Sequence, residues 1–235
     1  LSQELRKSPL QHRLYMLQYY CEGHEYFAKG FRFMQEPNGN ARLSGSMASL
    51  CGLEKAIELN DEYQINLAIK KINLQHAIIL SLGGIPMIYS GDEIATLNYY
   101  DYLNEEDKKQ DNRWLHRPMM NWEIAQNLES YPFQKTVFDS LKKMIEVRKN
   151  TLAFEDRNDL EWIDSGNSHL LVYKKTDKTG KNIWIIANFS PYETVFAGWF
   201  IGINKNARNI LTDETFTIQY QNFIGSYTVL WLELE

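Results

Sequence analysis

Few residues in this chain could build a covalent or metal framework. Only two of the 235 residues are cysteine, Cys21 and Cys51, too few for a disulfide framework or a cysteine-based zinc site. They could pair with each other, but we favour two free thiols in a reducing compartment, and therefore a cytoplasmic protein. The five histidines are scattered, and no pair has metal-ligand spacing on a single helix. We expect no metal site and no cofactor.

Long apolar runs and clusters of basic residues are also lacking. The longest apolar run, Ala77 to Tyr89, is interrupted by a serine, two glycines and a proline, so no membrane span and no signal peptide are predicted. The net charge is −5 and the basic residues are dispersed, which argues against nucleic acid or an anionic membrane as a partner. The hydrophobic share of 44% is ordinary for a globular protein.

Apolar residues recur at helical spacing in much of the first half. We expect one or two helices over Leu10–Lys29, a loop over Arg32–Arg42 and a helical stretch over Ser44–Leu59 with Gly52 as its weak point. Further helices are predicted over Gln64–Leu82 and Phe133–Lys149.

The segment Ile85–Tyr89 is apolar throughout and is bounded by glycines. This pattern is typical of a strand buried on both faces of a parallel sheet, and such a strand needs neighbours on both sides. A long polar loop follows, from Gly91 to about Pro132, and loops of that length are often functional. The chain begins with Leu1 instead of methionine. We therefore expect it to be part of a longer protein.

After Asn150 the period of the apolar pattern changes to two, which predicts an antiparallel β-sandwich. In the last strand, Val229, Trp231 and Glu233 should face one way and Leu230, Leu232 and Leu234 the other. The expected strands are Glu161–Ile163, His169–Lys175, Asn182–Phe189, Glu193–Trp199, Arg208–Leu211, Phe216–Gln219 and Tyr227–Leu234.

Three segments carry a resemblance to a known family. Gly83–Glu93, with sequence GGIPMIYSGDE, resembles the last barrel strand of the α-amylase superfamily. Asp111–Pro118, with sequence DNRWLHRP and preceded by Thr96-Leu-Asn98, looks like the loop after that strand in amylosucrases. Ala41–Gly52, with sequence ARLSGSMASLCG, resembles the subdomain that amylosucrases carry after their seventh barrel strand. The chain from about Leu10 onward therefore resembles the C-terminal part of an amylosucrase-like enzyme.

The resemblance implies an α/β plus all-β architecture. The chain would hold the C-terminal part of a (β/α)₈ TIM barrel, followed by the antiparallel β-sandwich. Its divisions would be a remnant of the inserted helical subdomain over residues 1–62, the barrel end over 63–152 and the sandwich over 153–235. In such a barrel the active site lies on the loops after the strands, which here means Gly91 to Arg117.

The catalytic carboxylates of the family have no counterpart in this chain. Retaining glycosidases need a nucleophile and an acid/base close together, and the resemblance places both on barrel strands that precede this chain. A third carboxylate belongs to a His-Asp pair, which the sequence does not contain. We expect no catalytic residue here, and expect the chain alone to be inactive although its parent is an enzyme.

The resemblance implies a role in substrate binding for two arginines. Arg113 matches the arginine at the base of the glucosyl pocket, which pairs with an aspartate from the first part of the barrel. A guanidinium can hold a carboxylate and sugar hydroxyls in one plane. Arg42 matches an arginine near the acceptor side of the pocket. The alternatives are a simple loop salt bridge for Arg113 and an exposed loop arginine for Arg42.

Several neighbours of these arginines are candidate pocket-lining residues. They are Asp92, Glu93, Asp111 and Trp114. Trp114 could stack on a sugar or pack in the loop, and we interpret Glu93 as a structural hydrogen-bonding group. The acidic run from Asp101 to Asp107 could hold calcium, although a solvated charge cluster is favoured.

The resemblance implies a retaining glucosyltransferase or hydrolase acting on sucrose or an α-glucan. The alternatives are another specificity in the superfamily, a non-catalytic carbohydrate-binding module, and an interaction protein. The expected partners are the sugar and the N-terminal part of the same barrel. If the chain folds alone, its bared apolar surface predicts a homodimer.

Overall fold

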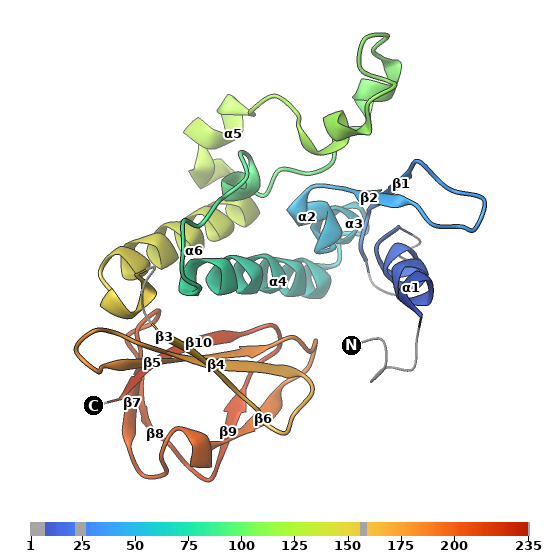
Figure 1. Ribbon diagram of the computed structural model, residues 1–235. Coiled ribbons are helices and arrows are strands. Elements are labelled where there is room, and N and C mark those ends of the chain that lie inside the picture. Colours follow the sequence, from blue (N-terminus) through green and yellow to red (C-terminus); the bar gives the residue numbers. More distant parts are fainter. Residues whose placement is uncertain (1–7, 22–26, 156–158, 235) are drawn as a thin grey trace. The chain divides into compact units, whose positions relative to one another are not determined.

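The computed structural model describes residues 8–21, 27–155 and 159–234 (Figure 1). The chain forms two compact units that interleave along the sequence. Unit 1 combines Leu1–Ile69 with Tyr89–Lys135, and unit 2 combines Lys70–Ile88 with Thr136–Glu235. The division into 1–62, 63–152 and 153–235 follows chain order instead and stays a prediction. None of the helices in the described ranges combines the length and the apolar character needed to cross a bilayer.

The first part of unit 1 is built from short elements. Helix α1 occupies part of the region predicted as helical, and residues 22–26 of that region lie outside the described residues. Most of the predicted loop Arg32–Arg42 is the connection of a hairpin, and strand residues occupy only its two ends. The two strands of the hairpin pair antiparallel, with Phe31 opposite Ser44. The elements in order are α1 (Pro9–Cys21), β1 (Phe31–Phe33), β2 (Arg42–Ser44), α2 (Met47–Leu50) and α3 (Leu53–Glu58).

Gly52 divides the predicted helical stretch Ser44–Leu59 into α2 and α3. Its φ of 98° lies in the left-handed region, where a side chain would be strained. A Cβ at this position would also lie 2.9 Å from Cβ of Phe27. The break therefore lies at the residue that the sequence marks as the weak point of the helix.

The two long helices agree with their predictions within two residues at either end. Helix α4 covers Glu62–Ser81 and helix α6 covers Pro132–Lys149, and each begins in unit 1 and ends in unit 2. Their unit 2 portions lie side by side (Figure 1), and Asn73 Nδ2 donates to Ser140 Oγ at 3.2 Å.

Arg148, near the end of α6, caps the C-terminal end of α4. Its guanidinium donates to the carbonyl oxygens of Leu80, Leu82 and Gly84, the last two at 2.8 Å. The final carbonyls of a helix have no partner within the helix. Arg148 therefore satisfies one carbonyl in the last turn of α4 and two carbonyls of the residues that follow the helix.

The prediction of a strand over Ile85–Tyr89 is wrong for this chain. The segment has no strand pairing with any described residue. Ile85 is 93% exposed and Met87 84% exposed, whereas Ile88 packs against the core of unit 2. A strand is stabilised by hydrogen bonds to its neighbours. The apolar composition predicted the character of the segment, but not whether neighbouring strands are present.

Unit 2 contains the antiparallel sheet that the alternating half of the sequence predicts. A six-stranded sheet has the order β3-β4-β5-β10-β7-β8, and β6 pairs with β9 in a separate ribbon. All of these pairings are antiparallel. The strands are β3 (Asp159–Ile163), β4 (Leu170–Thr176), β5 (Asn182–Asn188), β6 (Thr194–Ala197), β7 (Asn206–Asn209), β8 (Thr215–Thr217), β9 (Gln221–Ile224) and β10 (Val229–Leu234).

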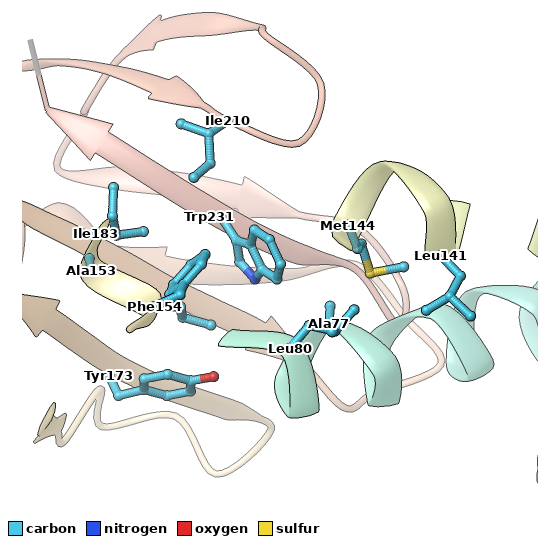
Figure 2. Close-up of a cluster of buried hydrophobic side chains, with 11 residues drawn as sticks. Ala77, Leu80, Leu141, Met144, Ala153, Phe154, Tyr173, Ile183, Ile210 and Trp231 are labelled. Carbon is cyan, nitrogen blue, oxygen red and sulfur yellow. The ribbon is translucent and has the colours of Figure 1, made fainter. Parts of the chain in front are cut away.

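The six-stranded sheet has an apolar cluster on each face. On one face, Trp231 and its sheet neighbours pack with α4 and α6 (Figure 2), and the ring centroids of Phe154 and Trp231 are 4.7 Å apart. On the other face, Leu232 packs with Phe196 of β6 and Ile224 of β9. The predicted alternation of the last strand is confirmed, since Val229 and Trp231 belong to the first cluster and Leu230, Leu232 and Leu234 to the second.

Candidate functional site

The candidate residues lie mainly on one long connection of unit 1, between α4 and α6. The sequence predicted a polar loop, and the structure folds it into a series of short helical turns. These are η1 (Asp92–Ile94), η2 (Asp101–Asn104), η3 (Asn112–His116), α5 (Trp122–Gln126) and η4 (Leu128–Ser130).

The first turn is closed by Glu93. Its Oε2 accepts a hydrogen bond from the Gly91 amide at 2.7 Å. Gly91 has a φ of 100°, and a Cβ there would lie 2.8 Å from Thr96 Oγ1. Asp92 is half-buried in the same turn. The observed contact of Glu93 shapes the backbone where the loop begins.

Asp111 and Arg113 form a local ion pair at the start of η3. Arg113 Nε lies 2.8 Å from both carboxylate oxygens of Asp111, and Nη2 lies 2.5 Å from Oδ2. Asp111 Oδ1 also accepts from the Arg113 amide at 3.0 Å. These hydrogen bonds lower the pKa of Asp111 to about 2. The side chain of Arg113 is 64% exposed, so its guanidinium remains open to water.

The partner of Arg113 thus differs from the one that the resemblance implied. An aspartate from the first part of the barrel was expected, and Asp111, two residues away, holds the guanidinium here. One edge of the guanidinium is used by that carboxylate. An arginine has five N–H donors, so others remain for further acceptors.

Trp114 is held by a short chain of contacts within the loop. Lys108 Nζ lies 5.0 Å from the centre of the indole ring. Lys108 also pairs with Glu105, which accepts from the Tyr99 hydroxyl at 2.8 Å. The hydrogen bonds from Lys108 and Tyr99 lower the pKa of Glu105. These contacts keep the carboxylate ionised and brace the indole from one side.

A cavity of about 420 Å³ opens beside Trp114 within unit 1. Its lining mixes apolar side chains with amides and two cationic groups, and therefore offers both apolar contact and hydrogen-bond donors. The lining residues are Ile94, Ala95, Thr96, Leu97, Asn98, Tyr99, Lys108, Trp114, Arg117, Pro118, Met119, Asn121, Ile124 and Gln134. Of the predicted residues, Trp114 lines this cavity. Arg113 directly precedes Trp114 in η3.

His116 and Arg117 end the η3 turn. His116 is half-buried, and its ring centroid lies 6.2 Å from that of Tyr89. Burial, followed by the charge of Arg117, lowers the pKa of His116. The imidazole is therefore neutral near pH 7. Arg117 lines the cavity, while His116 packs behind it on the same turn.

Arg42 lies on a different element that contacts the same turn. It begins strand β2 opposite Phe33 and is exposed. Ser44, two residues further along the strand, accepts a hydrogen bond from the Asn112 side chain, and Asn112 directly precedes Arg113. The structure therefore joins the strand of Arg42 to the turn of Arg113 through the pair Ser44–Asn112.

Sequence reasoning missed a group of buried polar residues in unit 1. The partly buried Asn98 joins them: its side-chain Oδ1 accepts from the Ser46 backbone amide at 2.8 Å, and its backbone N–H donates to Ser49 Oγ at 2.9 Å. Ser49 Oγ donates in turn to Glu54 at 2.5 Å. Ser46, Ser49 and Glu54 are all buried. The sequence motifs included Ser46, Ser49 and Asn98, though not Glu54, and gave no sign that these residues meet.

Lys29 neutralises the buried carboxylate of this group. Its Nζ lies 2.7 Å from Glu54 Oε1 and 2.6 Å from Glu58 Oε1. Burial acts to lower the pKa of Lys29, but its hydrogen bonds to the two carboxylates outweigh burial, so the pKa lies above its usual range. The buried Glu54 side chain is therefore contacted by both a cation and a hydroxyl.

No metal centre emerges from the described part of the chain. Within residues 8–21, 27–155 and 159–234, no three histidine, cysteine, aspartate or glutamate side chains are grouped to hold an ion. In the acidic run, Glu105 pairs with Lys108, and Glu106 pairs with Lys109 at 2.7 Å. Neighbouring lysines thus form ion pairs with two of the four carboxylates of the run Asp101–Asp107.

No protein-family model matches the sequence. Similar folds occur among solved structures. The α-amylase of Geobacillus thermoleovorans, complexed with acarbose, matches 78% of this chain and 36% of its own length, with a TM-score of 0.52 and 19% identity. The pullulanase of Anoxybacillus sp. LM18-11, complexed with maltotriose, matches 79% of this chain and 25% of its own, with a TM-score of 0.52 and 16% identity.

A third similar structure is the trehalulose synthase of Pseudomonas mesoacidophila. It matches 71% of this chain and 38% of its own length, with a TM-score of 0.51 and 13% identity. The chain therefore spans about a quarter to two fifths of the length of these proteins. At such identities the likeness shows a shared fold. Each of the three proteins is named as an enzyme of carbohydrates.

Proposed function

We propose that this chain is the C-terminal part of an amylosucrase-like enzyme of the α-amylase superfamily. The parent enzyme would act on sucrose, and would transfer the glucosyl unit to an α-glucan or to water with retention. This chain would contribute sugar-binding groups from unit 1 and no catalytic carboxylate.

The observation that carries the proposal is the setting of Trp114 in unit 1. Trp114 lines a cavity of about 420 Å³. Arg113 precedes it in sequence and Arg117 follows three residues later, and both arginines are exposed. An aromatic face with adjacent guanidinium and amide donors suits a pyranose ring, which has apolar faces and polar edges. The fold likeness to the amylase, the pullulanase and the trehalulose synthase supports the same substrate class.

Each candidate residue has a distinct role in this proposal. Trp114 would stack on the sugar, and Arg113, oriented by Asp111, would donate to hydroxyls of the glucosyl unit. Arg42 would approach from the acceptor side. Asp92 and Glu93 would shape the turn that begins the loop.

The exposed segment 85–89 supports the assignment to a longer barrel. The segment is not a strand in this chain, and we propose that upstream residues of the parent enzyme cover its exposed side chains. Ile85 and Met87 project into solvent here, and such side chains would be buried between a barrel sheet and its surroundings. Amide hydrogen exchange should find residues 85–89 unprotected in this chain and protected in the full-length parent.

Titration calorimetry of the purified chain with sucrose and with maltotriose tests the proposed binding. We expect binding of at least one sugar, weakened about tenfold in Trp114→Ala, which corresponds to about 1.4 kcal/mol. Arg113→Lys keeps the charge but loses the planar fork, and should also weaken binding. Trp199→Ala is the matched control, because Trp199 is 61% exposed in unit 2. If neither sugar binds to the wild-type chain, the proposal fails.

An activity assay on the same sample tests the absence of catalysis. With intact mass confirming a single species, we expect no fructose from sucrose. Fructose release would contradict the non-catalytic role, and Asp92, Glu93 and Asp111 would then be the carboxylates to replace. Light scattering tests the predicted homodimer, and a clean monomer at high concentration would exclude it.

A further inference from the structure

The polar group around Asn98 connects two segments that are far apart in sequence. One is the stretch from β2 to α3, which holds Ser44, Ser46, Ser49 and Glu54. The other is the loop over residues 97–117, which holds the residues proposed to contact sugar. The hydrogen bonds between Asn98 and the two serines join residues separated by 49 and 52 positions.

Two asparagines attach the loop at two separate points. Asn98, near its beginning, contacts Ser46 and Ser49, and also donates from Nδ2 to the Lys29 carbonyl at 2.6 Å. Asn112, near its end, donates to Ser44 Oγ and is 5% exposed. Between these points the loop braces itself, because the Tyr99 amide donates to the Leu115 carbonyl at 2.8 Å.

Hydrogen bonds position a group more narrowly than apolar contact does, since each has a preferred distance and direction. Breaking one in a buried setting also leaves its partner unsatisfied, which disfavours small displacements of the loop. Ser49 is fully buried and contacts Asn98, Ser46 and Glu54 at once, so it cannot follow the loop if the loop moves.

We propose that Asn98 and Asn112 are the positioning residues of the sugar-binding loop. Asn98 acts through its hydrogen bonds to Ser46 and Ser49, and Asn112 acts through its hydrogen bond to Ser44. They act through the backbone, and set where Arg113 and Trp114 stand relative to the cavity. This inference rests on the proposed function for its consequence, namely sugar affinity, while the positioning itself can be measured on the sugar-free chain.

The test combines hydrogen exchange with maltotriose titration on the whole chain. In Asn98→Ala, the amides of residues 97–117 should exchange about tenfold faster or more, while those of β4 and β5 are unchanged. Asn206→Ala is the matched control, because Asn206 is an exposed asparagine of unit 2 whose Oδ1 accepts from the Thr217 hydroxyl. Unchanged exchange of the loop in Asn98→Ala, or acceleration spread evenly over unit 2, would overturn the proposal.

A pair of variants at Ser44 separates positioning from general loss of structure. Ser44→Ala removes the acceptor for Asn112, whereas Ser44→Thr keeps the hydroxyl and suits a strand. We expect faster loop exchange and about tenfold weaker maltotriose binding in Ser44→Ala, with both restored in Ser44→Thr. If the two variants behave alike in exchange, the anchor at Asn112 is refuted.

The outcomes distinguish the positioning from the proposed function. A wild-type chain that fails to bind maltotriose, but whose loop is released by Asn98→Ala and Ser44→Ala, refutes the sugar site and supports the anchors. A chain that binds maltotriose equally well in all variants, with an unchanged loop, refutes the anchors and supports the sugar site.

Discussion

In unit 2, large apolar side chains pack against both faces of a six-stranded sheet, whereas in unit 1 the loop that carries the candidate residues is joined to the β2–α3 stretch by buried, hydrogen-bonded polar groups. Apolar packing is non-directional and tolerates small shifts as long as volume is kept. A buried polar group is favourable only when its partners are in place. The contrast suggests that unit 2 contributes stability, while unit 1 fixes the geometry of a binding loop.

Among these variants, replacing Trp231 should cause the largest loss in the free energy of unfolding. The side chain is fully buried between the sheet and the helices of unit 2 (Figure 2). Trp231→Ala should lower the free energy of unfolding by about 3–5 kcal/mol. Urea denaturation of Trp231→Ala beside Trp199→Ala, an exposed tryptophan of the same unit, would measure the difference. Equal midpoints would contradict the assigned core.

Arg148 offers a polar contact inside the apolar unit. Arg148→Ala leaves the three carbonyls at the end of α4 without this donor, and should cost about 2 kcal/mol. Arg148→Lys keeps the charge but not the planar fork, so it should recover only part of the loss. Thermal unfolding of the two variants measures this difference. Full recovery by lysine would mean that charge alone suffices at the helix end.

Ser49 tests the polar interior of unit 1. Ser49→Ala removes a donor from buried Glu54 and an acceptor from the Asn98 amide, and should cost about 1–2 kcal/mol. Chemical denaturation gives the energy, and hydrogen exchange should place the loss in residues 97–117. A loss without any local change in exchange would contradict the directional role given to these hydrogen bonds.

The smallest effect on stability is expected at the exposed pair Asp111–Arg113. The pKa of Asp111 is depressed to about 2, so its contribution to stability is present above the unfolded-state pKa of about 3.9 and is lost as pH falls through the folded value. Carboxyl NMR titration should find the low pKa in the wild type and a higher pKa in Arg113→Ala, which loses the side-chain hydrogen bonds but keeps the backbone amide donor. Thermal unfolding at pH 7 should hardly differ between the two, because exposed pairs contribute little.

Much of unit 2 could be predicted because its pattern follows local rules. In β10 the apolar residues alternate between the two clusters, as period-two alternation requires. Strand β9 was missed because it inverts that rule: Asn222 is buried and Phe223 is 70% exposed. The Asn222 side chain donates to the Gln219 carbonyl at 2.9 Å, a contact that apolar periodicity does not register.

The candidate site was harder to predict for a physical reason. The motifs pointed to the right segments, but Asn98, Ser46 and Ser49 gain their roles from contacts across about 50 positions of chain. Polar residues in loops are usually exposed, so sequence alone gives no reason to bury them. The prediction of a strand over Ile85–Tyr89 failed for another reason: an apolar composition does not create strand pairing, and among the described residues this segment pairs with no strand.

The most direct test of the central claim is an NMR titration of the ¹⁵N-labelled chain with maltotriose. The account predicts that the NMR signals of the Trp114 indole N–H and of the amides of residues 97–117 change in chemical shift as sugar is added. The signal of the Trp231 indole N–H, in the core of unit 2, should not change. Shifts confined to exposed aromatic residues of unit 2, such as Trp162 or Trp199, would contradict a sugar site on this loop.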